Sequence, residues 1–209
     1  MRCVIIGAAP IKNYERISSY LKPDDFIIAC DAGLNHTEKL RIRPNLIVGD
    51  FDSTKNPDSK EIETIVLPRE KDDTDSVYAL KTAFSRGFSD FLFLGMIGDR
   101  FDHSLGNLSL LLRCQEKNFP AIMADDFSEM EIAGKTEVEI SGRCKFFSLL
   151  PVSGPAEGIT IKNAKFPLEN GRINPENAQL GVSNEVLPGK KAKVSVQKGL
   201  LLLVKIFQS

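Results

Sequence analysis

The chain has 209 residues and a formal net charge of −1, with 42% hydrophobic and 26% charged residues. These values are ordinary for a globular protein of one large or two small domains, and they give no electrostatic case for a nucleic-acid partner or an anionic membrane surface. No apolar run approaches the roughly 20 residues of a transmembrane helix, and the first residues lack the cleavage region of a signal peptide.

The first part of the chain, up to about residue 135, contains short and almost continuously apolar runs. They lie at residues 2–7, 26–30, 46–49, 64–67, 91–95 and 121–124. Runs of this kind are typical of strands in a parallel sheet that is covered on both faces. We therefore predict a buried, mostly parallel sheet for this part of the chain.

Helical patterns lie between these runs. Apolar residues at helical spacing predict a helix over residues 74–86, and Leu105, Leu108 and Leu112 predict another over residues 102–116. Strands that alternate with helices are typical of βαβ units. The predicted fold of this part is α/β, with a Rossmann-like, mostly parallel sheet flanked by helices.

After residue 135 the helical patterns disappear and short strand-like pieces separated by turn residues take over. They lie at residues 136–140, 145–150, 158–162, 192–197 and 200–206. This pattern predicts an all-β sandwich domain, with domains over residues 1–130 and 131–209. A unit of about 75 residues is marginal by itself, so we expect it to pack against the first domain, a second chain, or both.

The cysteines are widely spaced and form no Cys-x-x-Cys motif. They are Cys3, Cys30, Cys114 and Cys144. Such spacing favours free, buried thiols in a reducing compartment over metal or redox chemistry. We therefore expect a cytoplasmic protein.

The first polar motif, Gly-Asp-Phe-Asp-Ser, directly follows the predicted strand at residues 46–49. In open α/β sheets, ligands bind beyond the carboxyl ends of the strands, so Asp50 and Asp52 are candidate ligands of a cation. The alternative is a polar loop in which Asp50 or Ser53 caps a helix.

The second motif precedes the helix predicted over residues 74–86. Thr74 is the expected N-cap, and Asp72, Asp73 and Asp75 surround it, with Lys71 in front. The helix dipole alone could account for one or two of these carboxylates. It does not account for Lys71, which could neutralise a phosphate, so cap and site both stay open.

The third motif follows the strand predicted at residues 91–95. Gly95 and Gly98 suit a tight, phosphate-facing turn, and Arg100 offers a planar fork for phosphate oxygens. Asp102 and His103 then open a helix. The alternative for His103 is a structural hydrogen bond near the start of that helix.

Three acidic motifs within about fifty residues need something positive to hold them together, because close carboxylates repel one another. Mg²⁺ prefers oxygen ligands and often binds one or two carboxylates together with substrate phosphates. The motifs therefore predict a Mg²⁺-dependent enzyme acting on a nucleotide. In the second domain, the residues alone favour a core aromatic for Phe166 and a turn after a strand for residues 182–185.

In this order, the motifs resemble those of the thiamine pyrophosphokinase family in its bacterial form. The resemblance includes Asp-Ala-Gly-Leu-Asn at residues 31–35, the three motifs above, Val-Ser-Asn-Glu at residues 182–185, and the β-domain segments 147–151 and 158–161. The chain departs from the family pattern in having Ala32 for a glycine, Leu34 for a small residue, and Asp99 for a second glycine.

The resemblance implies an N-terminal domain that binds ATP and Mg²⁺, a C-terminal β-sandwich, and a homodimer with thiamine bound at the subunit interface. It implies transfer of a pyrophosphoryl group from ATP to the hydroxyl of thiamine, giving thiamine pyrophosphate and AMP. The alternatives are another Mg²⁺-dependent small-molecule kinase or nucleotidyltransferase, and a protein that binds a nucleotide or thiamine without turnover.

The resemblance also implies roles for individual residues. The metal ligands are Asp50, Asp52 and Asp75, and the catalytic residues are Asp75, Asp102 and Arg100. The nucleotide-binding residues are Asp31, Asn35, Lys71, Asp72, Thr74, Gly95, Gly98, Arg100 and His103. The thiamine-binding residues are Phe166, Ser183 and Asn184.

Overall fold

The computed structural model describes residues 1–50, 62–68, 70 and 72–207, and it divides into two compact units, Met1–Asp126 and Phe127–Ser209. In the described parts of the chain, every helix is too short or too polar to cross a membrane. Each unit has its own core and is described by itself.

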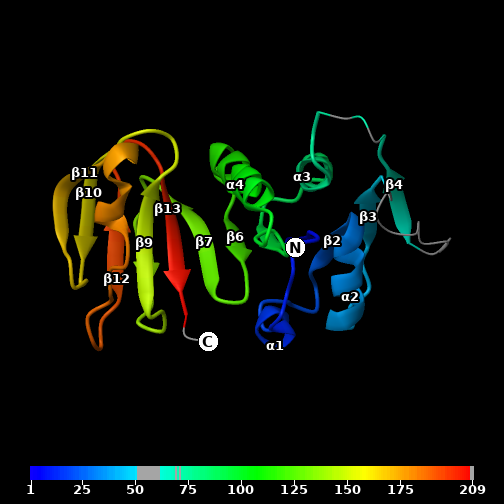
Figure 1. Ribbon diagram of the computed structural model, residues 1–209, viewed down its shortest axis with the longest axis horizontal. Coiled ribbons are helices and arrows are strands. Elements are labelled where there is room, and N and C mark those ends of the chain that lie inside the picture. Colours follow the sequence, from blue (N-terminus) through cyan, green and yellow to red (C-terminus); the bar gives the residue numbers. More distant parts are fainter. Residues whose placement is uncertain (51–61, 69, 71, 208–209) are drawn as a thin grey trace. The chain divides into compact units, whose positions relative to one another are not determined.

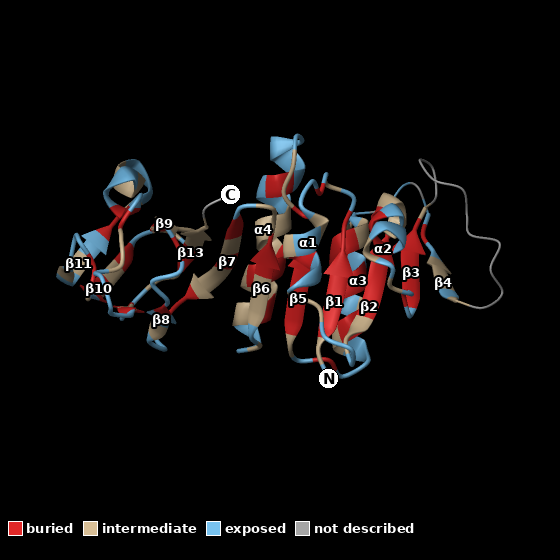
Figure 2. Cartoon of the chain, turned by 90° about the horizontal axis from the view of Figure 1, so that it is seen from below, coloured by how far each residue is buried: buried red, intermediate tan, exposed pale blue. Residues whose placement is uncertain are grey.

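The first unit contains a parallel sheet with the strand order β4-β3-β2-β1-β5-β6 (Figure 1; β1 and β5 are labelled in Figure 2). The strands are β1 (Cys3–Ile6), β2 (Phe26–Cys30), β3 (Leu46–Gly49), β4 (Glu63–Val66), β5 (Phe91–Leu94) and β6 (Ala121–Ala124). Every residue of β1, β3 and β5 is buried, whereas β4 at the edge is half exposed (Figure 2). The predicted parallel sheet is confirmed.

Helices cover both faces of this sheet. They are α1 (Tyr14–Ser18), α2 (Leu34–Leu40), α3 (Asp75–Ser85) and α4 (Phe101–Glu116). Ile17 of α1 packs on the face that carries Val4. The opposite face carries Phe91, and Phe84 of α3 meets it edge to face, with ring centroids 5.2 Å apart. Because β1 and β5 pair in register, the alternation of side chains places these two helices on opposite faces.

The helix predicted over residues 102–116 is confirmed, but the leucines that predicted it are not its buried stripe. Leu105 is 57% exposed, whereas Leu110 and Leu111 are buried. The helix carries apolar residues around more than one face. Helical spacing therefore identifies the helix without showing which stripe packs against the sheet.

The strand order reverses at β1, which has β2 on one side and β5 on the other. The loops that follow β1 and β5 therefore meet at a topological switch point, where ligands bind in open α/β sheets. Gly7 and Gly95 let these loops approach closely. A Cβ added at Gly7 would lie 2.6 Å from the Gly95 carbonyl oxygen, and Gly95 has a φ of +61°.

The second unit contains two antiparallel sheets, with strand orders β7-β13-β9 and β11-β10-β12-β8. The strands are β7 (Ser128–Ala133), β8 (Val138–Ile140), β9 (Phe146–Pro151), β10 (Ala156–Lys162), β11 (Leu168–Ile173), β12 (Ala192–Ser195) and β13 (Leu201–Ile206). Phe147 and Leu203 from the first sheet share one core with Ile140 and Ile159 from the second. The all-β prediction for this part of the chain is confirmed.

Local predictions in the second unit were wrong in two places. Phe166 lies outside the strands and is 59% exposed, so it is not a core aromatic. The segment at residues 182–185 follows the 3₁₀ helix η2 (Pro175–Gly181) and not a strand. The proline and the polar residues of η2 favour a capped turn, and Asn174 forms a capping box with Asn177.

Two further strands, β7 and β11, were missed by the sequence analysis. In β7 the acidic residues Glu129 and Glu131 interrupt the apolar pattern. Both pair with Lys205 of the neighbouring strand β13, at 3.1 Å and 2.8 Å. A partner so distant in the sequence gives no local signal, which is why β7 was not predicted.

Candidate active site

A cavity of about 770 Å³ opens at the carboxyl edge of the parallel sheet. The loops after β1, β2, β3 and β5 form its walls together with the starts of α3 and α4. Its described lining carries seven aspartates and two arginines, namely Asp31, Asp50, Asp72, Asp73, Asp75, Asp99, Asp102, Arg100 and Arg113. This excess of negative charge favours ligands that bring a cation with them.

Most of the predicted site residues meet at this cavity. Those that line it are Asp31, Asp50, Asp72, Thr74, Asp75, Gly95, Gly98, Arg100, Asp102 and His103. Asn35 is exposed on α2 and is not among the residues that line the cavity. Asp52 and Lys71 lie outside the described residues, and the three predicted thiamine-binding residues belong to the second unit.

The loops after β2 and β3 bring Asp31 and Asp50 to neighbouring positions. Asp31 has a φ of 43°, and a Cβ added at Gly49 would lie 3.2 Å from the Asp31 Cα. A glycine at position 49 therefore allows the backbone of Asp31 to approach the end of β3. As a result, two carboxylates from adjacent strands reach the same wall of the cavity.

The start of α3 places another carboxylate in the cavity. Thr74 is the N-cap, as predicted, and its Oγ1 accepts a hydrogen bond from the Val77 amide at 3.4 Å. Asp75 is the first helical residue, where the helix dipole favours a negative charge. Asp73 has a separate explanation, because it forms an ion pair with Lys81 at 2.5 Å.

Arg100 and Asp102 form a bidentate pair at the start of α4. Nε and Nη2 of Arg100 donate to the two carboxylate oxygens of Asp102 at 2.9 Å and 2.6 Å. Both side chains are well exposed, at 69% and 65%. The hydrogen bonds from Arg100 hold the pKa of Asp102 well below its usual range. Asp102 is therefore a weak proton acceptor while the pair is formed.

The glycine turn before Arg100 is held by packing and by a hydroxyl. A Cβ added at Gly98 would lie 2.7 Å from Cδ of Pro10, so the turn needs a glycine to fit against the loop after β1. Oγ of Ser104 accepts a hydrogen bond from the Gly98 amide at 3.0 Å and faces the Arg100 carbonyl at 3.1 Å. These contacts fix the backbone from which Arg100 extends.

The loop after β1, residues 7–10, also lines the cavity and was missed by the sequence analysis. It has no polar side chain, so a search for chemical motifs had no signal there. His36 holds this loop through a 3.0 Å contact between its Nε2 and the Ala9 carbonyl. Since a carbonyl only accepts, Nε2 carries the proton and Nδ1 accepts from the Tyr14 hydroxyl at 2.7 Å.

The lining offers oxygen donors that suit Mg²⁺, and Asp50 and Asp75 are its candidate protein ligands. Within the described ranges, no three histidine, cysteine or acidic side chains are grouped closely enough to hold a metal ion. The third predicted ligand, Asp52, lies outside those ranges. The donor chemistry therefore fits a hard cation that also binds oxygens of a substrate.

In the second unit, Asn184 fixes the loop that carries Phe166. Its Oδ1 accepts from the Phe166 and Glu185 amides at 3.0 Å and 2.9 Å, and its Nδ2 donates to the Phe166 carbonyl at 2.8 Å. Asn184 is buried, whereas the ring of Phe166 and the side chain of Ser183 are exposed. The amide of Asn184 therefore supports an exposed aromatic ring.

The cysteines are free and buried. Burial raises the pKa of the Cys3 and Cys114 thiols to about 12. These thiols stay protonated at neutral pH and are poor nucleophiles or metal ligands. Burial also raises the pKa of Cys30, the cysteine that lines the cavity, so the charged groups of the site are its carboxylates and arginines.

Comparison with known proteins gives matches along both units. Residues 17–123 match the family model "Thiamin pyrophosphokinase, catalytic domain", and residues 135–201 match "Thiamin pyrophosphokinase, vitamin B1 binding domain". The chain is 26% identical over 208 residues to the thiamine pyrophosphokinase of Bacillus subtilis (strain 168), covering 96% of each chain. It is also 26% identical over 199 residues to thiamin pyrophosphokinase 1 of Caenorhabditis elegans, covering 88% of this chain and 81% of that protein.

Solved structures share the fold. The crystal structure of the Bacillus subtilis thiamine pyrophosphokinase matches with a TM-score of 0.88 at 23% identity, covering all of both chains. That of the Geobacillus thermodenitrificans enzyme matches with a TM-score of 0.84 at 24% identity, covering 100% of this chain and 99% of that one. Since the two family models together match well over half of its residues, the chain belongs to the thiamine pyrophosphokinase family.

Proposed function

We propose that this chain is a thiamine pyrophosphokinase, which transfers the pyrophosphoryl group of ATP to the hydroxyl of thiamine and releases AMP. The observation that carries the proposal is the acidic cavity at the carboxyl edge of the parallel sheet, because all of its aspartates and arginines lie in the part that matches the family's catalytic domain. In this proposal the sheet edge serves as a Rossmann-like nucleotide site, and the reaction takes place in the cytoplasm.

Mg²⁺ is the cofactor that best suits this carboxylate lining. Asp50 and Asp75, with Asp52, would hold it. When bound, the ion neutralises negative charge on the phosphate oxygens of ATP. Without a cation the same carboxylates would repel a nucleotide, so the chain's own charge makes nucleotide binding depend on the metal.

The remaining work falls to residues of the chain. Arg100 presents a planar fork that suits phosphate oxygens, and its exposed pair with Asp102 leaves it able to exchange one anionic partner for another. Asp75 or Asp102 would orient the thiamine hydroxyl or accept its proton, and the lowered pKa of Asp102 makes it a weak acceptor as long as it stays paired with Arg100. Asp31, Asp72 and Lys71 complete the nucleotide contacts in this proposal.

Thiamine would bind against the second unit of a partner chain in a homodimer. Binding pockets for heteroaromatic ligands combine an apolar wall with a few fixed polar groups. Phe166 offers an exposed ring for that wall, and Asn184, which follows Ser183 in the chain, hydrogen-bonds to the backbone of Phe166. In this arrangement Asn184 acts by holding the Phe166 loop in place.

The direct test is incubation of the protein with ATP, thiamine and Mg²⁺, followed by phosphorus NMR. AMP formed in proportion to thiamine consumed supports the proposal. Release of ADP or of pyrophosphate would instead indicate another kinase or a nucleotidyltransferase, and binding without turnover would indicate a sensor.

A mixing experiment tests the shared site. An Asp75→Asn chain mixed with a Ser183→Ala/Asn184→Ala chain should regain part of the activity, because one hybrid site is intact. Full activity of a monomer in sedimentation, or no recovery despite proven subunit exchange, would refute the dimeric site.

A further inference from the structure

Asn107 of α4 joins the two halves of the cavity wall. On one side its Oδ1 accepts a hydrogen bond from the Ser76 hydroxyl of α3 at 3.0 Å. On the other side its Nδ2 donates to the Met96 carbonyl, in the turn after β5, at 2.9 Å. All three residues line the cavity.

The bridge continues into the cap of α3. The Thr74 and Ser76 hydroxyl oxygens are 3.1 Å apart, and the Thr74 oxygen also accepts from the Val77 amide. A carbonyl only accepts, so the amide nitrogen of Asn107 must face Met96 and its oxygen must face Ser76. Ser76 then donates to Asn107, and the Thr74 hydroxyl donates to Ser76. Every group in the chain of bonds has one defined role.

The bridge lies between the groups proposed to act on the reactants. At one end is the first turn of α3, which carries Asp75, and at the other is the turn that carries Arg100. Ser76 and Met96 are buried, so removing Asn107 would take the side-chain donor from the buried Met96 carbonyl and leave the Ser76 hydroxyl with its contact to Thr74 alone among the bonds of the bridge. The first turn of α3 and the turn that carries Arg100 would then no longer be held at a fixed distance from each other. A shift of about 1 Å between catalytic groups can lower the rate about 10²-fold.

We infer that Asn107 is a positioning residue, which with Ser76 sets the spacing between the Asp75 carboxylate and the Arg100 turn. This role rests on the proposed function for its effect on turnover. Asn107 and Ser76 act as one unit through a shared hydrogen bond and touch different elements. The inference therefore predicts that their substitutions are not additive.

The test compares Asn107→Ala, Ser76→Ala and the double variant. A matched control is Ser85→Ala on α3, the helix of Ser76, where the exposed hydroxyl donates to the Thr82 carbonyl one turn earlier in the same helix. Each bridge variant should lower kcat about tenfold or more with the KM for thiamine within about twofold, and the double variant should lose no more than the worse single one. The control should match the wild type.

Two kinetic outcomes would overturn the inference. One is a folded Asn107→Ala protein with the wild-type kcat. The other is a double variant whose loss is the product of the single losses, since the residues would then act separately. Should Asn107→Ala fail to fold, Asn107→Asp serves instead, because it keeps the shape and the acceptor but loses the donor to Met96, and the same loss of kcat is expected.

Hydrogen exchange supplies a readout independent of turnover. The amides of Val77 and Gly98 bond to hydroxyls on the two sides of the bridge. Both should exchange faster in Asn107→Ala than in the wild type, and neither should change in Ser85→Ala. Unchanged exchange at both amides would overturn the bridge. If the wild type forms no AMP from ATP and thiamine, the proposed function fails while this measurement still decides the positioning role.

Discussion

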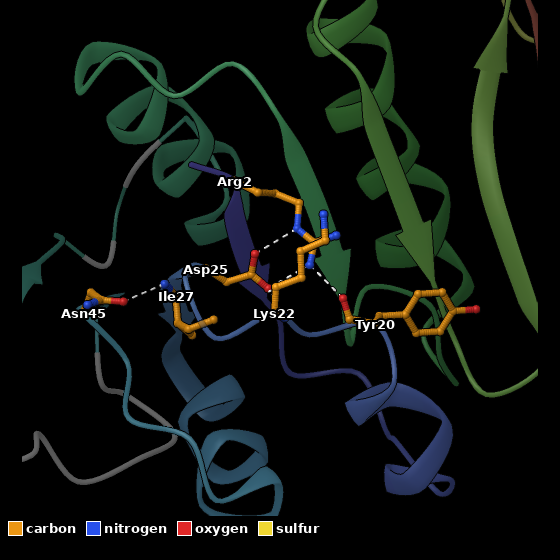
Figure 3. A network of polar contacts seen from close by, with 6 residues as sticks. All are labelled: Arg2, Tyr20, Lys22, Asp25, Ile27 and Asn45. Carbon is orange, nitrogen blue, oxygen red and sulfur yellow. Dashed lines mark hydrogen bonds and ion pairs between the residues drawn. The ribbon is translucent and has the colours of Figure 1, made fainter.

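The two edges of the parallel sheet carry the same kind of arginine–aspartate pair in opposite surroundings. At the amino edge, Arg2 binds both oxygens of Asp25, at 3.0 Å and 2.7 Å, and the side chains are only 14% and 1% exposed (Figure 3). At the carboxyl edge, Arg100 binds both oxygens of Asp102 with side chains 69% and 65% exposed.

The amino-edge pair is also saturated by its neighbours. Arg2 donates to the Tyr20 carbonyl, and Asp25 accepts from the Lys22 amide, both at 2.7 Å. Nearby, Asn45 directly precedes β3, and its side-chain oxygen accepts a hydrogen bond from the Ile27 amide of β2 (Figure 3). Identical chemistry therefore supports stability where it is buried and satisfied, and is available for ligands where it is exposed and surrounded by excess carboxylates.

The largest effect is expected from a substitution at the carboxyl edge of the sheet, and it should be an effect on kcat. Asp75→Asn should lower kcat by about 10²–10⁴-fold, because it removes both a candidate metal ligand and a candidate proton acceptor. Stability should change little, since the relief of repulsion between neighbouring carboxylates opposes the loss of the interaction with the helix dipole. Rates of AMP formation and urea unfolding of the same samples check both statements. Activity within a few-fold of the wild type at saturating Mg²⁺ would exclude Asp75 from the site.

The corresponding substitution at the amino edge of the sheet should instead affect stability. Asp25→Ala should lower the free energy of unfolding by about 3–5 kcal/mol, because it leaves a buried guanidinium without its charge partner. The kcat of the remaining folded protein should stay close to the wild type. Urea titration gives the stability. As a control, Arg2→Met/Asp25→Leu should lose less than Asp25→Ala, since replacing both charges leaves neither one unpaired.

The strands of the parallel sheet could be predicted closely because a strand that is buried on both faces consists of a continuous run of apolar residues. The runs at residues 26–30, 46–49 and 121–124 match β2, β3 and β6 to the residue. Strand β7 could not be predicted, since its glutamates interrupt the apolar pattern and pair with Lys205, more than seventy residues later.

The candidate site also contains residues that could be predicted from the sequence and residues that could not. Residues whose side chains carry charge, such as Asp50 and Arg100, stand out in the sequence because carboxylates and guanidiniums imply chemistry wherever they cluster. The loop at residues 7–10 lines the cavity with backbone and small side chains, which carry no such signal. The bridging role of Asn107 depends on partners from two other elements, so spacing within its own helix could not reveal it.

A smaller effect sharpens the contrast between the two arginines. Arg100→Lys should lower kcat/KM for ATP about tenfold, because lysine keeps the charge but loses the planar, bidentate fork. The free energy of unfolding should hardly change, since an exposed ion pair contributes little to stability. Steady-state kinetics at saturating thiamine, with urea unfolding alongside, measure the two quantities. A lysine variant with the wild-type kcat/KM would make Arg100 a general surface charge.

The smallest expected effect concerns His36, which hydrogen-bonds to the Ala9 carbonyl of the loop at residues 7–10. Burial lowers the pKa of His36 below its ordinary value of 6.5, although the bond to the Ala9 carbonyl opposes this. The unfolded chain therefore binds more protons than the folded chain in the pH range just below 6.5. By linkage, the free energy of unfolding should fall as the pH is lowered through 6.5 and should level off below the folded pKa.

Urea titrations at several pH values between about 7.5 and 5 measure this dependence. The free energy of unfolding should change less with pH in His36→Gln, because glutamine does not titrate in this range. The only other histidine, His103, is present in both proteins, so its contribution cancels. An equal slope in the variant would mean that carboxylates set the pH dependence of this unit and that His36 does not.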